Sequence, residues 1–219
     1  MTVVFGPRVR RTPVERPDRP GPDRFPGYDV REQLDHWDSV TAGVVLRRLG
    51  PPPDLRFFSV AEQPTVEALF DQLLDQRDDP KVPVLQLVDS RLCEAQTDGW
   101  RHEEMPEDGD SWHVTLHFLD VDATEAFGRR FHDCDDDQQR RLLDNVQAAA
   151  TWHDLPARWV WSLWTRYAAA AFYSHPWAWN EIGFGGPAYP RGYKNIGVDK
   201  REPWEVRDHA PQDPTREVR

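Results

Sequence analysis

The chain has 219 residues and a formal net charge of −11 at pH 7. This length suffices for one sizeable hydrophobic core, so we expect a single domain. The acidic balance argues against a nucleic-acid partner and against docking on anionic lipid, because each of these requires a basic protein face.

The two cysteines, Cys93 and Cys134, are too few for a thiolate zinc site, an iron–sulfur cluster or a disulfide framework. No apolar stretch is long enough to span a bilayer. Arg10 and Arg11 are followed by Thr, Pro, Val and Glu instead of the apolar region of an export signal. We therefore expect a cytoplasmic protein with reduced thiols and no membrane insertion.

Both ends of the chain have the composition of disordered segments. Residues 1–27 hold six prolines and alternate Arg with Asp or Glu, so they cannot bury enough apolar surface to offset chain entropy. Residues 207–219 are polar and proline-containing. We expect an arm at 1–27, one domain at 28–206 and a tail at 207–219.

Three helices are predicted in the first half of that domain. The first runs from about Asp38 to Arg48 and is stopped by Gly50 and three prolines. The second follows a capping box of Ser59 and Glu62 and buries a stripe at helical spacing made of Val66, Leu69, Phe70, Leu73 and Leu74. The third begins at Pro83 and buries Val84, Leu85, Val88 and Leu92.

Three more helices are predicted in the second half. One opens at Ser111, one is capped by the acidic run 135–137, and the last runs from about Pro156 to Tyr173. No segment alternates in the manner of a strand. The sequence therefore predicts an all-α, single-domain bundle of about six helices, followed by a C-terminal loop rich in Gly, Pro and aromatic residues.

Residues 172–198 combine dense aromatics with three prolines and several glycines. Proline removes backbone donors and glycine opens conformations closed to other residues, so we expect a non-helical, ordered series of turns. Its aromatics can serve as core anchors, as a partner surface or as a sugar-binding platform.

The segment 174–190 carries a resemblance to a known family. Its sequence, Ser-His-Pro-Trp-Ala-Trp-Asn-Glu-Ile-Gly-Phe-Gly-Gly-Pro-Ala-Tyr-Pro, resembles the C-terminal signature of the gluconate 2-dehydrogenase small subunit (subunit 3) family. Upstream, residues 57–62, 78–84 and 129–131 follow a similar order of elements. The resemblance covers about residues 37–206.

This resemblance implies a non-catalytic accessory subunit that binds and stabilises a flavin-dependent dehydrogenase of the glucose-methanol-choline type, which oxidises sugars or polyols. The FAD would then belong to the large partner subunit, and we expect no catalytic, cofactor-binding or metal-binding residues in this chain. In exported complexes the family's small subunit commonly carries the twin-arginine signal. Without that signal, this chain would be exported only as the passenger of a signal-bearing partner.

We expect the partner-binding surface within the C-terminal segment. Its predicted members are Phe172, Tyr173, His175, Pro176, Trp177, Trp179, Asn180, Glu181, Phe184, Gly185, Gly186, Pro187, Tyr189 and Tyr193.

The competing hypothesis is an independent carbohydrate-binding module or enzyme that uses a cluster of His and Trp residues. His113 and His117 have the i, i+4 spacing of metal ligands but lack the glutamate of the zinc-protease pattern. His153 with Asp154, and His175 with Glu181, could form acid–base pairs but have no evident nucleophile. Residues 183–187 match no phosphate-binding loop.

Overall fold

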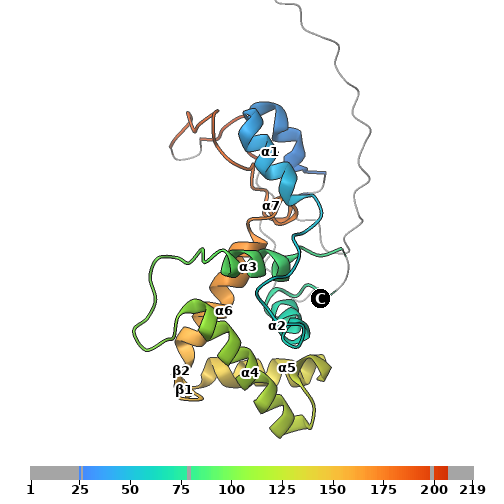
Figure 1. Ribbon diagram of the computed structural model, residues 1–219. Helices are drawn as coiled ribbons and strands as arrows, with labels where there is room; N and C mark the ends of the chain where they lie inside the picture. Colours follow the sequence, from blue (N-terminus) through green and yellow to red (C-terminus); the bar gives the residue numbers. More distant parts are fainter. Residues whose placement is uncertain (1–24, 26, 78–79, 198–199, 207–219) are drawn as a thin grey trace, which may run out of the picture.

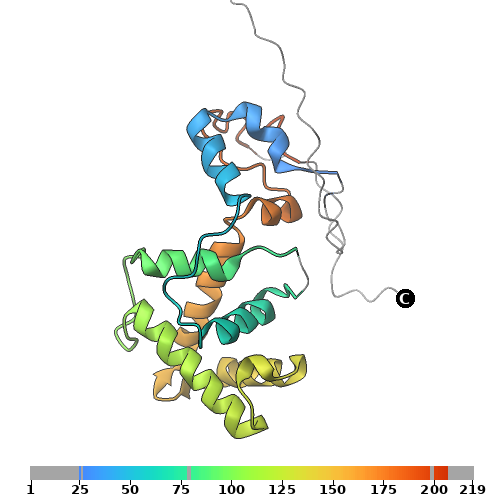
Figure 2. The same cartoon turned by 45° about the vertical axis from the view of Figure 1, so that its right-hand side comes forward.

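The computed structural model describes residues 25, 27–77, 80–197 and 200–206 (Figure 1). The proposed tail 207–219, and all of the proposed arm 1–27 except residues 25 and 27, lie outside these residues. The chain forms a helical bundle joined to a smaller part, and Figures 1 and 2 show the two stacked one above the other.

The helical bundle contains five α-helices, one short 3-10 helix and one hairpin of two-residue strands. They are α2 (Gln63–Leu74), α3 (Val84–Cys93), α4 (Asp108–Phe127), η2 (Phe131–Asp133), α5 (Asp136–Ala148), β1 (Thr151–Trp152), β2 (Leu155–Pro156) and α6 (Ala157–Phe172). The second part, here named the small lobe, consists of η1 (Val30–His36), α1 (Ser39–Arg48), α7 (Pro176–Ile182) and the segment 183–206.

Helix α6 is the central element of the bundle and packs on α2, α3, α4 and α5. Its apolar positions recur every three or four residues, so one face is buried along its length. Trp164 is fully buried, and its indole Nε1 donates a hydrogen bond of 3.0 Å to Thr115 Oγ1 on α4. The Trp164 indole therefore has its polar atom satisfied inside the core, whereas Nε1 of the equally buried Trp112 has no hydrogen-bond partner among the described residues.

Two buried or partly buried carboxylates hold loops to the bundle. Asp89 on α3 is fully buried and accepts three backbone N–H bonds, from Arg56, Phe57 and Phe58, at 2.7, 2.9 and 2.9 Å. This contact orders the chain that enters the bundle from the proline-rich linker.

Asp120 on α4 holds η2 in the same way. One carboxylate oxygen accepts from Arg130 Nε and Nη2 at 2.9 and 2.6 Å, and the other accepts from the Phe131 backbone N at 3.0 Å and from Thr65 Oγ1 at 2.9 Å. The Arg-Arg-Phe run at 129–131 therefore connects α2, α4 and η2, which is a structural role.

The all-α fold is confirmed. Helices α1, α3 and α6 match the predicted ranges, and α5 begins with a capping box in which Asp135 bonds the Gln138 backbone N. Helix α4 begins at Asp108, three residues before the predicted start. Glu62 does accept from Ser59 N and Oγ, at 2.9 and 2.6 Å, but this pair forms a turn before α2, which begins at Gln63.

The prediction of a non-helical C-terminal segment is wrong for residues 176–182. Pro176 is the first residue of α7, where the missing N–H costs nothing, and His175 Nδ1 caps the helix by accepting from Trp177 N at 3.2 Å. The hairpin at 151–156 also differs from the prediction. His153 and Asp154 form its tight turn, with φ of 46° and 63°.

Asp89→Ala should lower the free energy of unfolding by about 3 kcal/mol, because three backbone N–H groups would lose a charged acceptor. Denaturant unfolding of both proteins measures this difference. Asp137→Ala is the matched control, since Asp137 is an exposed partner of Arg140, and its cost should stay below about 1 kcal/mol. Equal effects of the two changes would contradict the role given to Asp89.

Candidate functional site

Trp179 of α7, which is only 4% exposed, connects the small lobe to the end of α6 in the bundle. Its indole Nε1 donates a 2.6 Å bond to the Tyr173 carbonyl, and the Phe184 ring meets it edge-on at 5.5 Å. Arg48 of α1 lies over the same indole, 5.8 Å from the ring centroid, and donates a 2.7 Å bond to the Ser174 carbonyl. Trp179 is therefore an internal anchor that fixes α1 against the end of α6.

The turn after α7 is held by Trp37. The Trp37 indole Nε1 donates a 2.8 Å bond to the Pro187 carbonyl. Gly186 has a φ of 75°, and a Cβ atom placed there would overlap the Trp37 ring. Asn180 of α7 accepts a 2.8 Å bond from the Val30 backbone N, which fixes the start of η1. Glycine is needed at 186 for both its conformation and its lack of a side chain.

The segment after this turn is tied back by Arg191. Its guanidinium lies 3.6 Å from the Trp204 ring centroid and donates to the Gly185 carbonyl at 2.5 Å and to Gln33 Oε1 at 3.0 Å. A stacked, hydrogen-bonded arginine of this kind loses much of its rotamer freedom. The backbone that presents the C-terminal aromatics is therefore ordered by contacts within the chain.

Tyr28 reinforces the same turn from the N-terminal side. Its hydroxyl donates a 3.1 Å bond to the Phe184 carbonyl, and burial raises the pKa of Tyr28 to about 12. The phenol therefore stays protonated and able to donate at neutral pH.

The structure divides the fourteen predicted partner-binding residues into three groups. The buried ones are Phe172, His175, Pro176, Trp179, Gly185 and Gly186. The half-buried ones are Trp177, Asn180 and Pro187. The exposed ones, which can touch another molecule as the structure stands, are Tyr173, Glu181, Phe184, Tyr189 and Tyr193.

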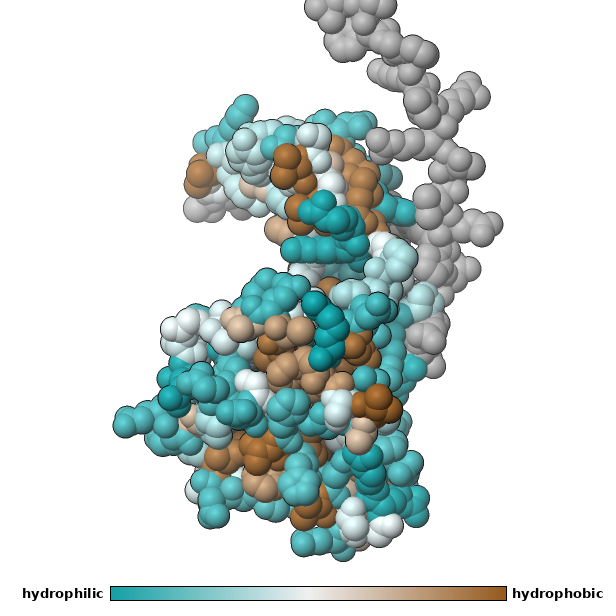
Figure 3. All heavy atoms as spheres, in the orientation of Figure 1, coloured by the Kyte–Doolittle hydropathy of each residue, from teal (hydrophilic) through white to brown (hydrophobic). Residues whose placement is uncertain are grey.

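Several exposed apolar residues of the small lobe were missed by the sequence analysis. They are Val40, Val44, Leu46, Ile182 and Ile196. Figure 3 shows apolar side chains at the surface of this lobe, in the upper part of the view. The spacing of Val40 and Val44 places both on one face of α1, a signal that could have been noticed, whereas the exposure of Ile182 and Ile196 depends on tertiary packing.

Charge is distributed unevenly between the two parts of the molecule. Residues 60–128, which include α2, α3 and α4, carry 17 acidic and 4 basic side chains. The segments 25–59 and 173–206, which include the small lobe, carry 9 acidic and 8 basic side chains. The apolar surface of the small lobe therefore lies in a region of almost balanced charge.

The histidines singled out in the sequence have individual neighbours. His113 stacks on Phe57 at 4.6 Å and bonds Glu62 Oε1 at 2.6 Å, and His117 lies 5.9 Å from the Phe118 ring. His153 bonds Asp122 Oδ1 at 2.6 Å. Within the part of the chain that the structure describes, no group of three His, Cys, Asp or Glu residues could hold a metal ion.

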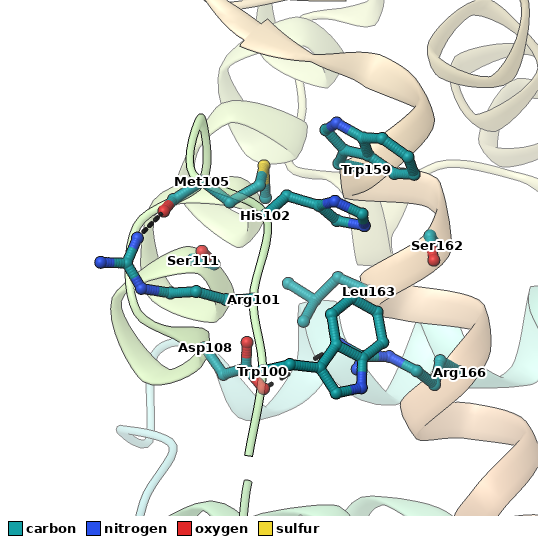
Figure 4. A pocket seen from close by; sticks show the side chains of 10 residues that line it. All are labelled: Trp100, Arg101, His102, Met105, Asp108, Ser111, Trp159, Ser162, Leu163 and Arg166. Atoms are coloured by element: carbon teal, nitrogen blue, oxygen red, sulfur yellow. Dashed lines mark hydrogen bonds and ion pairs between the residues drawn. The ribbon is translucent and has the colours of Figure 1, made fainter. Parts of the chain in front are cut away.

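A recess lies on the bundle, between α6 and the segment 97–107 (Figure 4). His102 stacks on Trp159 with ring centroids 3.3 Å apart, and the Arg166 guanidinium lies 4.7 Å from the Trp100 ring centroid. Trp100 and His102 are not among the predicted site residues, because nothing in the sequence indicates that they meet α6.

Gly186→Ala should destabilise the small lobe, since its Cβ would displace the Trp37 ring in addition to straining a left-handed backbone. Gly192→Ala is the matched control, with a φ of 68° and no atom within 4 Å of the added Cβ. Hydrogen exchange of the 30–37 amides should accelerate at least tenfold in the first variant and remain close to wild type in the second. Equal exchange in both would contradict the role of the Trp37 contact.

None of the helices described here is both long and apolar enough to cross a membrane. Comparisons with curated proteins and with solved structures gave no match. The family model for gluconate 2-dehydrogenase subunit 3 matches residues 60–186, which is more than half of the chain and runs from the turn before α2 through Gly186. The matched range is narrower than the 37–206 expected from the sequence and leaves out η1, α1 and the segment after Gly186. The chain belongs to the gluconate 2-dehydrogenase subunit 3 family.

Proposed function

We propose that this chain is the accessory subunit that binds and stabilises a flavin-dependent dehydrogenase of the glucose-methanol-choline type, which oxidises sugars or polyols. Family membership supports a subunit of a dehydrogenase complex. The observation that carries the proposal further is the exposed apolar surface of the small lobe. The backbone of this surface is ordered by the contacts of Trp37 and Arg191 within the chain.

The proposed docking surface consists of residues on α7, on the segment after it and at the end of α6. They are Tyr173, Ile182, Phe184, Tyr189, Tyr193 and Ile196. Tyrosine is favoured at interfaces because it buries a large ring at low entropic cost and keeps a polar hydroxyl for the rim. Preorganisation by Trp37 and Arg191 lowers the ordering entropy lost on association.

The FAD and the catalytic residues belong, in this proposal, to the large subunit. The sequence of this chain has no Gly-x-Gly-x-x-Gly segment between a strand and a helix, the motif with which Rossmann-type domains bind dinucleotides. We place the complex in the cytoplasm, with export possible if the large subunit carries a signal of its own.

Co-expression of this chain with a flavoprotein dehydrogenase from the same genome, followed by a tagged pull-down, tests the proposal. A yellow partner that co-purifies in a fixed ratio and shows a flavin spectrum is the expected result. A soluble, colourless protein without a partner would contradict the proposal and favour the independent carbohydrate-binding function.

Tyr189→Ala should weaken the complex by about tenfold, because Tyr189 is 67% exposed on the proposed surface and its removal should leave the fold intact. The dissociation constant of the purified complex measures the effect. Val60→Ala is the matched control, since Val60 is an apolar residue, 83% exposed, outside the small lobe. A larger loss from Val60→Ala than from Tyr189→Ala would move the docking surface to the bundle.

A further inference from the structure

We infer that the recess at Trp100 binds a neutral, polyhydroxylated small molecule, a monosaccharide or a linear polyol. The site is built from the segment 97–107, the start of α4 and α6. None of the residues that line this site belongs to the proposed docking surface, so the inference goes beyond the accessory role.

Two residues that line the recess carry unused hydrogen-bond donors. Arg166 Nε and Trp159 Nε1 are buried, and neither has a hydrogen-bond partner among the residues that the structure describes. Both residues line the recess, which encloses about 20 Å³. This volume accommodates one water molecule or one hydroxyl group. In Figure 4 the Trp159 nitrogen lies on the side of its ring away from Asp108, so Arg166 Nε is the donor beside Asp108. Because buried donors are normally satisfied, Arg166 Nε is suited to an oxygen atom supplied from outside.

A buried hydrogen-bond acceptor, Asp108, lines the same recess. Asp108 is only 6% exposed, and its Oδ2 accepts a 2.6 Å bond from the Tyr167 hydroxyl. The Asp108 side chain lines both the recess and the wider depression beside it. Asp108 Oδ2 also lies 4.0 Å from Arg166 Nη2. A hydroxyl group both donates and accepts, so it can donate to the Asp108 carboxylate and accept from Arg166 Nε at the same time.

The charged side chains around the recess favour a neutral ligand. Three arginines near the site, Arg91, Arg101 and Arg166, already have a carboxylate partner. These pairs are Arg91 with Asp98, Arg166 with Asp98, and Arg101 with Glu107. The consecutive residues Glu103 and Glu104, in the same segment, add further negative charge. Arg158 lies over the Trp159 ring, 4.3 Å from its centroid, but does not line the recess or the depression. An anionic ligand would therefore meet carboxylates and only paired arginines among the lining residues, and a neutral ligand fits better.

The Trp100 ring forms an aromatic surface beside these polar groups. The Trp100 indole is 52% exposed, and Arg166 lies over one of its faces. The adjoining depression measures about 380 Å³ and is lined by Thr97, Gly99, Trp100, Arg101, Glu107 and Asp108. This size falls within the range of small-molecule sites. His102 makes a T-shaped contact with the Trp100 ring at 5.2 Å. The part of the indole that remains exposed can pack on the C–H face of a sugar ring while the carboxylates bind its hydroxyls.

Titration of the ¹⁵N-labelled full chain, without any partner, tests the inference through the indole N–H signals in NMR spectra. Glucose and sorbitol should shift the Trp159 and Trp100 signals saturably, and gluconate should not. Trp100→Ala should weaken glucose binding by about tenfold, whereas Val60→Ala, a change at an exposed apolar residue outside both proposed sites, should leave it unchanged.

Absence of a saturable shift, or equal binding by Trp100→Ala and wild type, would overturn the inference. Equally tight binding of gluconate would overturn its restriction to neutral ligands. Thermal unfolding of each variant shows whether the fold is retained, and Trp100→Phe, which keeps an aromatic ring, should recover part of the binding lost in Trp100→Ala. Since the chain is titrated alone, failure here leaves the accessory function standing, and failure of the pull-down leaves this site standing.

Discussion

The contact between Trp37 and Gly186 is the constraint on which the small lobe depends. Helices α1 and α7 and the 3-10 helix η1 are each too short to be stable alone, and their shared core consists of four buried residues, Val30, Trp37, Val45 and Trp179. Trp37 closes this core by packing where a side chain at 186 would otherwise be. Without it, the segment after α7 would have no fixed position from which to present its aromatic residues.

This constraint explains why glycine and aromatic residues are concentrated near the C-terminus. Trp37 and Trp204 lie against the backbone at Gly186 and Gly185, and Arg191 joins them through its stacking on Trp204 and its bond to Gly185. Part of the aromatic content therefore serves the interior of the lobe, and only the remainder can face another molecule. The buried contacts order the backbone of this segment, and its exposed side chains can then bind a partner with a smaller loss of entropy.

Helical periodicity in the sequence was sufficient to predict the bundle, since each helix buries a regular stripe. The prediction fails for α7 because proline inside a segment breaks a helix, whereas Pro176 occupies the first helical position, where proline favours a helix. The tertiary contacts could not be predicted from local patterns. Trp37 and Gly186, like Trp100 and Arg166, are far apart in the sequence, and only the folded chain brings them together.

The uneven charge of the molecule bears on how two sites could operate together. The acidic bundle would repel an acidic partner surface and remain hydrated, whereas the small lobe has little net charge and exposes apolar side chains. Docking through the proposed surface would use residues different from those around Trp100. The recess would then be occupied or empty without altering the residues that contact the partner, and a neutral ligand would not disturb the charge balance of either region.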